Sequence, residues 1–116
     1  MSAPDAVVAQ PFPYAGPEEL RAPVIAALGR VVDPELAMAI LDVGLVVGVR
    51  VDGNDLQVLL TMTSAACPVA DVIVDDAWNE LTRGMPASFT IDIQLVWEPE
   101  WTAARMSDRA RRFMGW

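Results

Sequence analysis

The sequence predicts a small α+β domain, a two-layer sandwich in which two main helices pack on a three-stranded sheet. Apolar residues recur with helical spacing in two segments, and they alternate with polar residues in three others. The predicted element order is α-β-β-α-β-α. With 116 residues, 53% of them hydrophobic, the chain is long enough for one core and too short for two domains.

The first predicted helix covers residues 23–32. Pro23 suits the first position of a helix, and apolar residues follow at i, i+4 and i+7 from Val24. The residue before a proline avoids the helical region, so Pro34 ends this helix. Residues 1–20 hold four prolines and no sustained periodicity, and we expect them to form a flexible arm that precedes a domain over residues 21–116.

An antiparallel hairpin is predicted in the middle of the chain. Residues 45–52 and 55–63 both alternate between apolar and polar side chains, as half-buried strands do. Between them lies Gly53-Asn54, a two-residue connection that can adopt the positive φ values of a primed turn.

The second main helix is predicted over residues 69–83, followed by a third strand over residues 89–97. Pro68 suits the first helical turn, and Gly84 suits the position just after the helix. A last short helix follows Ser107, whose side chain can cap it, and extends to Phe113 or Met114. The apolar positions assigned to the second helix are Ala70, Val74, Ala77, Trp78 and Leu81.

The charge balance excludes two classes of partner. The chain has 16 acidic and 8 basic residues, all of the latter Arg, for a net charge of −8 and a pI near 4.2. This charge argues against nucleic acid and anionic membrane surfaces. No apolar stretch reaches the roughly 20 residues of a membrane span, and residues 1–20 lack the pattern of a signal peptide. We therefore expect a soluble, cytoplasmic protein.

The chain has no histidine and one cysteine, Cys67, so an imidazole base, an intrachain disulfide and a CxxC zinc site are excluded. Cys67 directly precedes Pro68 at the predicted helix start, where free N–H groups and the helix dipole stabilise a thiolate. Asp71, about one turn into the helix, opposes this effect. The alternative role of a lone cysteine is that of a small buried hydrophobic side chain.

Two further pairs of polar residues are candidates for a site. Asp33 and Glu35 flank Pro34 in a rigid turn, where carboxylates serve as hard metal ligands, hydrogen-bond anchors or helix caps. Thr61 and Thr63 share one face of the second predicted strand, which leads to Cys67. The alternative for these threonines is ordinary strand propensity.

Aromatic residues near the C-terminus are candidates for binding a partner. Trp97 and Trp101 bracket an acidic Glu-Pro-Glu segment and either form a lid on the core or anchor an interface. Trp116 either folds back on the domain or docks to a partner. Four of the arginines lie near the same end, as a solvated helix face or a docking site for an acidic partner: Arg105, Arg109, Arg111 and Arg112.

Together, five segments resemble the SufT-like family of metal–sulfur cluster assembly factors, whose domain also occurs in PaaD and in the targeting subunit of the cytosolic iron–sulfur machinery. The segments are DPEL (33–36), GLV (44–46), LLTMT (59–63), SAACP (64–68) and W-x-P-x-W-T (97–102). Two departures are an alanine at 66, where some members have glycine, and the absence of the cysteine-rich zinc segment of PaaD.

The resemblance implies a compact domain with Cys67 near an acidic pair, Asp33 and Glu35, and near the strand-end Thr63. It also implies a non-catalytic factor that carries iron or a cluster transiently, or delivers client apo-proteins to the iron–sulfur assembly machinery. A stable cluster within one chain is excluded, because a cluster usually needs four thiolates. Three routes stay open: a homodimer presenting two Cys67 thiolates, transient binding at one Cys67, and recognition of a client without metal.

Two other functions stay open. The first is an adaptor dedicated to a multicomponent oxygenase, as PaaD is, with Cys67 dispensable. The second is a thiol enzyme, which in the absence of histidine would need a carboxylate or a substrate group as its base.

Overall fold

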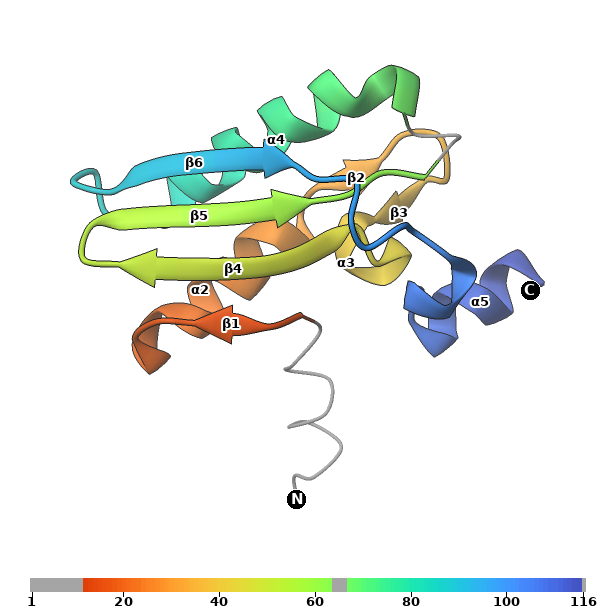
Figure 1. Cartoon of the computed structure of the whole chain (residues 1–116), viewed down its shortest axis with the longest axis horizontal. Helices are drawn as coiled ribbons and strands as arrows, with labels where there is room; N and C mark the ends of the chain where they lie inside the picture. Colours follow the sequence, from red (N-terminus) through yellow and green to blue (C-terminus); the bar gives the residue numbers. More distant parts are fainter. Residues whose placement is uncertain (1–11, 64–66, 116) are drawn as a thin grey trace.

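The structure, a computed structural model, describes residues 12–63 and 67–115. Its main element is a four-stranded sheet in the order β1-β4-β5-β6 (Figure 1). The strands are β1 (Tyr14–Ala15), β4 (Val46–Asp52), β5 (Asp55–Leu60) and β6 (Thr90–Leu95). Helices α2 (Glu18–Gly29) and α4 (Ala70–Gly84) pack on one face of this sheet. A small mixed α/β fold is thus confirmed, with more strands than predicted.

The predicted hairpin is confirmed. β4 and β5 are antiparallel, with Asp52 opposite Asp55 across a two-residue turn. Gly53 has φ +61°, the one positive φ in this turn, as expected for a type II′ geometry. β6 runs parallel to β5, because α4 carries the chain back to the starting end of the sheet between them.

The first helix begins earlier than predicted. It starts at Glu18, where two acidic residues favour the positive end of the helix dipole, and Pro23 lies inside it. Before it, Phe12 is buried and Tyr14 begins β1, which pairs in parallel with β4. Residues 12–20, assigned to the flexible arm from the sequence, are therefore part of the fold, whereas residues 1–11 lie outside the described residues.

The second main helix has the predicted length but a different buried face. Its fully buried positions include Ile73, whereas Trp78 is 47% exposed. The helix packs through positions 70, 73, 77 and 81, spaced by three and four residues. The buried face is therefore rotated by part of a turn around the helix axis from the face predicted from the sequence. The prediction missed this because apolar residues flank the buried positions on both sides.

A small substructure connects α2 to the main sheet and was not predicted. It consists of β2 (Val32–Asp33) paired antiparallel with β3 (Met38–Ala39), followed by the single-turn helix α3 (Ile40–Val43). The turn between these strands includes Ala37 at φ +56°. Strands of two residues are too short to show an alternating pattern in the sequence. The DPEL motif at 33–36 was the feature that drew attention to this region.

The C-terminal segment folds back on α3. It contains the 3-10 turn η2 (Ala103–Arg105) and helix α5 (Asp108–Met114), whose Ser107 cap is confirmed by a 3.1 Å hydrogen bond from the Ala110 amide. Ser107 Oγ also donates to Asp42 Oδ1 at 2.8 Å. Arg105 donates to the carbonyl oxygens of Gly44 and Val46 at 2.8 and 3.2 Å.

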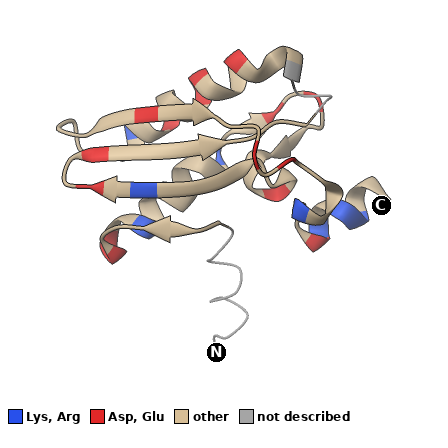
Figure 2. Cartoon of the chain, in the orientation of Figure 1, with Lys and Arg blue, Asp and Glu red and all other residues tan. Residues whose placement is uncertain are grey.

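Basic residues gather on the C-terminal helix, and two of them form ion pairs (Figure 2). Arg109 forms an ion pair with Asp42 at 2.6 Å, and Arg111 pairs with Asp108 one turn away. The pair with Asp42 fastens α5 to α3, and the pair with Asp108 lies within α5. No helix in the described part of the chain has the length and apolar character needed to cross a membrane.

Candidate functional site

The candidate site lies where β5 ends and the chain turns into α4. Cys67 begins the 3-10 turn η1 (Cys67–Val69), and α4 follows without a gap at Ala70. The predicted position of Cys67 at a helix start is therefore confirmed for the backbone, although the cap residue of α4 itself is Val69. Asp71 lies in the first turn of α4, as expected.

Two buried threonines lead towards this helix start. β5 ends at Leu60, three residues earlier than predicted, but the Thr61 amide still donates to the Leu45 carbonyl at 2.8 Å. Thr61 and Thr63 are buried, and so is Met62 between them. Successive side chains of an extended segment point to opposite sides, so both sides of the chain are covered here. This end of the sheet is consequently a closed, low-dielectric environment.

Asp33 is completely buried at the end of β2. Its Oδ1 accepts hydrogen bonds from the amides of Glu35 at 2.8 Å and Leu36 at 3.4 Å, and its carbonyl accepts from the Ala37 amide at 2.7 Å. Its Oδ2 is buried and has no hydrogen-bond partner among the described residues. One carboxylate oxygen thus fixes the turn, and the other is held in place as an unused acceptor.

Glu35 has a different environment from its predicted partner. Its backbone amide donates a hydrogen bond to Asp33 Oδ1, but the residue itself is exposed to solvent. The two acidic residues therefore do not form a matched pair of carboxylates. Asp33 is a buried hydrogen-bond acceptor with a fixed orientation, whereas the Glu35 carboxylate lies at the surface, where a ligand or partner can reach it.

These residues lie toward one end of the molecule. In Figure 1 the β2–β3 turn, the end of β5 and the start of α4 all lie toward the same end of the long axis. Residues 64–66, which link Thr63 to Cys67, lie outside the described residues. Among the residues that are described, no group of three or more acidic or cysteine side chains is placed to hold a metal ion.

The three tryptophans singled out from the sequence have different environments. Trp101 is half-buried, packs against the core and donates its indole N–H to the Val43 carbonyl at 2.8 Å, as a lid would. Trp97 follows β6 and is 59% exposed, as an interface residue would be. Trp116 lies outside the described residues.

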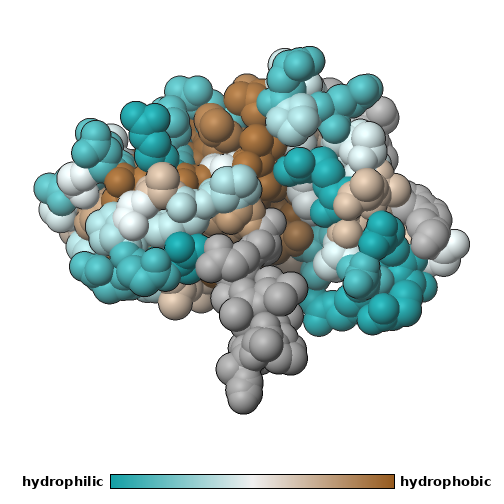
Figure 3. Space-filling model, turned by 60° about the horizontal axis from the view of Figure 1, so that its bottom comes forward, coloured by the Kyte–Doolittle hydropathy of each residue, from teal (hydrophilic) through white to brown (hydrophobic). Residues whose placement is uncertain are grey.

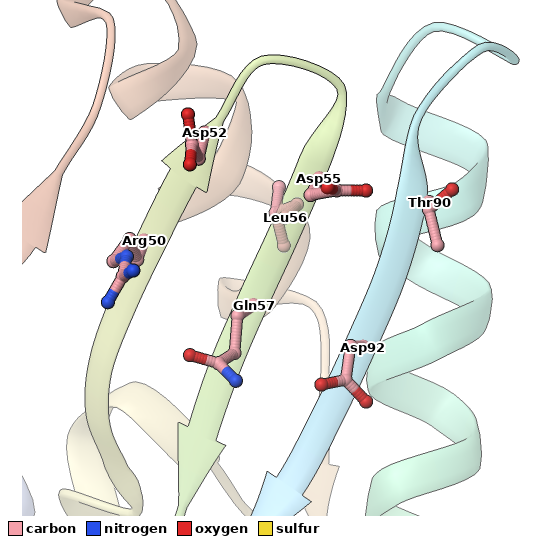
Figure 4. A pocket seen from close by; sticks show the side chains of 7 residues that line it. All are labelled: Arg50, Asp52, Asp55, Leu56, Gln57, Thr90 and Asp92. Atoms are coloured by element: carbon pink, nitrogen blue, oxygen red, sulfur yellow. The ribbon is translucent and has the colours of Figure 1, made fainter.

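The face of the sheet opposite α2 and α4 carries a polar hollow that sequence reasoning missed (Figure 4). It lies at the hairpin end, away from Cys67. Its lining residues are Arg50, Asp52, Asp55, Leu56, Gln57, Thr90 and Asp92. The sequence shows the polar residues of this hollow only as the polar positions of three separate alternating strands. The strand order of the folded sheet is needed to know that they lie side by side. The surface also has a band of apolar side chains between polar regions (Figure 3).

Residues 21–94 match the family described as iron–sulfur cluster assembly protein, and this stretch includes Asp33, Thr63 and Cys67. The chain belongs to this family. The resemblance seen in the sequence is therefore confirmed, and the buried turn, the threonine-bearing strand end and the helix start all lie inside the matched residues.

Several curated relatives carry names from iron–sulfur metabolism. The chain is 37% identical over 99 residues to the Fe-S protein maturation auxiliary factor YitW of Bacillus subtilis, covering 84% of this chain and 96% of that protein. It is 36% identical over 86 residues to the Fe-S protein maturation auxiliary factor SufT of Staphylococcus aureus, covering 73% and 97% of the two chains.

Solved structures share the fold. A domain of unknown function from Bacillus anthracis aligns with a TM-score of 0.76 and 36% identity, over 84% of this chain and 93% of that one. A conserved hypothetical protein from Thermotoga maritima aligns with a TM-score of 0.69 and 31% identity, over 88% and 97% of the two chains. The fold described above is thus that of relatives with similar length.

Proposed function

We propose that this protein is an auxiliary factor in the maturation of iron–sulfur proteins that holds iron or a cluster transiently at Cys67 and passes it to client apo-proteins or to the assembly machinery. The observation that carries the proposal is the family match over residues 21–94, joined with relatives named as Fe-S protein maturation auxiliary factors. The role requires binding and release and no turnover chemistry.

The position of Cys67 supports a ligand role. A thiolate is the soft ligand that iron–sulfur clusters use, and N–H groups at the start of a helix stabilise its negative charge. The η1 turn and α4 provide such a start directly after Cys67. Because one chain contributes one thiolate, outside thiols or a client must complete the coordination, which keeps the cargo exchangeable.

Asp33 ends β2, which lies toward the same end of the molecule as the start of α4, and it is the acidic candidate for the site. Its Oδ1 is held by two backbone amides, so its orientation is fixed before any ligand arrives. Its Oδ2 is a buried acceptor with no partner in the described parts of the chain. Such an oxygen can bind iron as a hard ligand or accept a proton-bearing group of the cargo. Exposed Glu35 then offers a second carboxylate toward an incoming partner.

Transfer to a purified apo-client tests this role. The chain is loaded anaerobically with ferrous iron and sulfide in the presence of a low-molecular-weight thiol, separated from unbound metal, and mixed with an apo iron–sulfur enzyme whose activity is then followed. We expect the wild type to restore activity and Cys67→Ser to lose most of its metal and its transfer.

The same assay separates the runner-up function. An adaptor dedicated to one oxygenase would act without the thiol, so equal transfer by wild type and Cys67→Ser contradicts the proposal. Ala87→Ser is the control, because Ala87 is exposed in the connection between α4 and β6, at the opposite end of α4 from Cys67.

A further inference from the structure

β6 forms one edge of the main sheet and pairs only with β5 among the described strands. The Thr90 amide donates to the Asn54 carbonyl at 2.8 Å, and the Val96 amide donates to the Leu60 carbonyl at 2.7 Å. Backbone groups alternate between the two sides of a strand, so the even-numbered residues of β6 face β5. The N–H and C=O groups of the three odd-numbered residues therefore point outward, away from the sheet. These residues are Ile91, Ile93 and Leu95.

Helix α4 presents apolar surface beside this free edge. Glu80 forms a 2.7 Å ion pair with Arg30 of α2, which marks the flank of α4 that faces α2. Val74 and Trp78, one turn apart, lie on the opposite flank. Because α2 and α4 cover the same face of the sheet and α4 contacts β6, that flank overlooks the edge. Trp78 is 47% exposed there.

The chemistry of β6 is symmetric about Ile93. Two antiparallel copies centred on this residue place Ile93 opposite Ile93, and Ile91 opposite Leu95. Every outward N–H of these positions then meets a carbonyl of the other copy. The apolar side chains, half-buried in one chain, meet on the α4 side of the joined sheet, where the two exposed Trp78 rings also approach.

The polar side chains favour this register over the one centred on Asp92. On the exposed face, Asp92 of one copy lies opposite Gln94 of the other, twice, so each carboxylate meets an amide donor. Within one chain Gln94 already donates to Asp92 at 3.0 Å, which shows that the two groups pair well. Centring the pair on Asp92 would instead place two carboxylates directly opposite each other, which is unfavourable.

We propose that the free edge of β6 is a homodimer interface, through which two copies of this chain join their sheets into one continuous eight-stranded sheet. The pairing removes the unpaired strand edge that each copy otherwise exposes, and it covers Trp78. Each copy carries a net charge of −8, so the copies repel at long range and association should tighten as salt is added.

The interface has a consequence that rests on the proposed function. β5 and β6 both end toward Cys67, and the two copies run antiparallel, so their Cys67 residues lie at opposite ends of the joined sheet. Because Leu95 of one copy lies opposite Ile91 of the other, the two β6 ends are four residues, about 13 Å, apart along the strands, and each Cys67 lies beyond its own end. The two thiols therefore do not share one cluster in this dimer, and each copy handles its cargo alone.

Sedimentation of the full-length chain over a range of concentrations tests the interface. Ile93→Pro removes an outward N–H and leaves the groups that pair with β5 in place, as proline on an edge strand does. Ile93→Ala is the matched control, because it loses the same side chain and keeps the N–H. We expect a wild-type dimer, and an Ile93→Pro dimer at least about tenfold weaker than that of Ile93→Ala. A monomeric wild type, or equal association of the two variants, overturns the proposal.

Two exposed substitutions test the register without disturbing the core. Gln94→Lys places an ammonium opposite Asp92 and should tighten the dimer, whereas Gln94→Asp places a second carboxylate there and should weaken it. No change in either variant overturns the register. In the wild type, hydrogen exchange at the amides of Ile91, Ile93 and Leu95 should slow as concentration rises, a readout that needs no variant. These measurements use no client, so they fail or succeed independently of the maturation role.

Discussion

At the level of single residues, Asp33 combines a structural task with an unused acceptor. Its Oδ1 satisfies two backbone amides inside a fully buried turn. Asp33→Ala leaves those amides without their acceptor, so we expect the free energy of unfolding to fall by about 1–3 kcal/mol. Asp33→Asn retains an acceptor oxygen and should lose less. Urea unfolding of the three proteins measures this, and an Asp33→Ala variant as stable as the wild type would refute the anchoring role.

Gly44 packs directly against the backbone of Arg105 in the C-terminal segment. It has φ +84°, and a Cβ there would lie 2.2 Å from the Arg105 carbonyl oxygen. Gly53 has φ +61° with open space around it, so it is a matched control for backbone strain alone. We expect Gly44→Ala to melt well below Gly53→Ala and to expose the C-terminal arginines to trypsin. Equal melting temperatures would show that the segment does not press on Gly44.

At the level of elements, one ion pair joins the two helices that cover the sheet. The hydrogen bond from Arg30 lowers the pKa of Glu80 below its usual value of 4.5. A carboxyl with a lowered pKa in the folded state stabilises the fold above its unfolded pKa, and the contribution is lost as pH falls through the folded pKa. Glu80→Gln should therefore flatten the fall in stability below about pH 4.5. Acid unfolding curves of the wild type and of Glu80→Gln test this, and identical curves would contradict the prediction.

The elements show which features a sequence can and cannot predict. The hairpin and α4 were predictable because their periodic patterns extend over six or more residues. β1, β2 and β3 have two residues each, too few for a pattern, and they form only because the rest of the fold is present. The early start of α2 was missed because Pro23 was assigned to the first turn, whereas the acidic residues at 18 and 19 determine the start.

At the level of the whole molecule, the sequence predicts which residues belong to the candidate site. It does not predict whether each of them is buried or exposed. Cys67 at a helix start and the strand-end threonines follow from residue order alone. The contrast between buried Asp33 and exposed Glu35 does not, because it depends on how the β2–β3 turn packs against distant parts of the chain. The same holds for Trp97 and Trp101, which are equivalent in sequence and opposite in burial and hydrogen bonding.

The central claim is that maturation depends on the Cys67 thiol and not on the fold alone. The most direct test is the activity of an iron–sulfur client enzyme in cells that carry Cys67→Ser in place of the wild-type chain, together with the melting temperature of the purified variant. We predict that client activity is lost while the melting temperature is unchanged. Full client activity with Cys67→Ser would contradict the account and indicate an adaptor that acts through its surface.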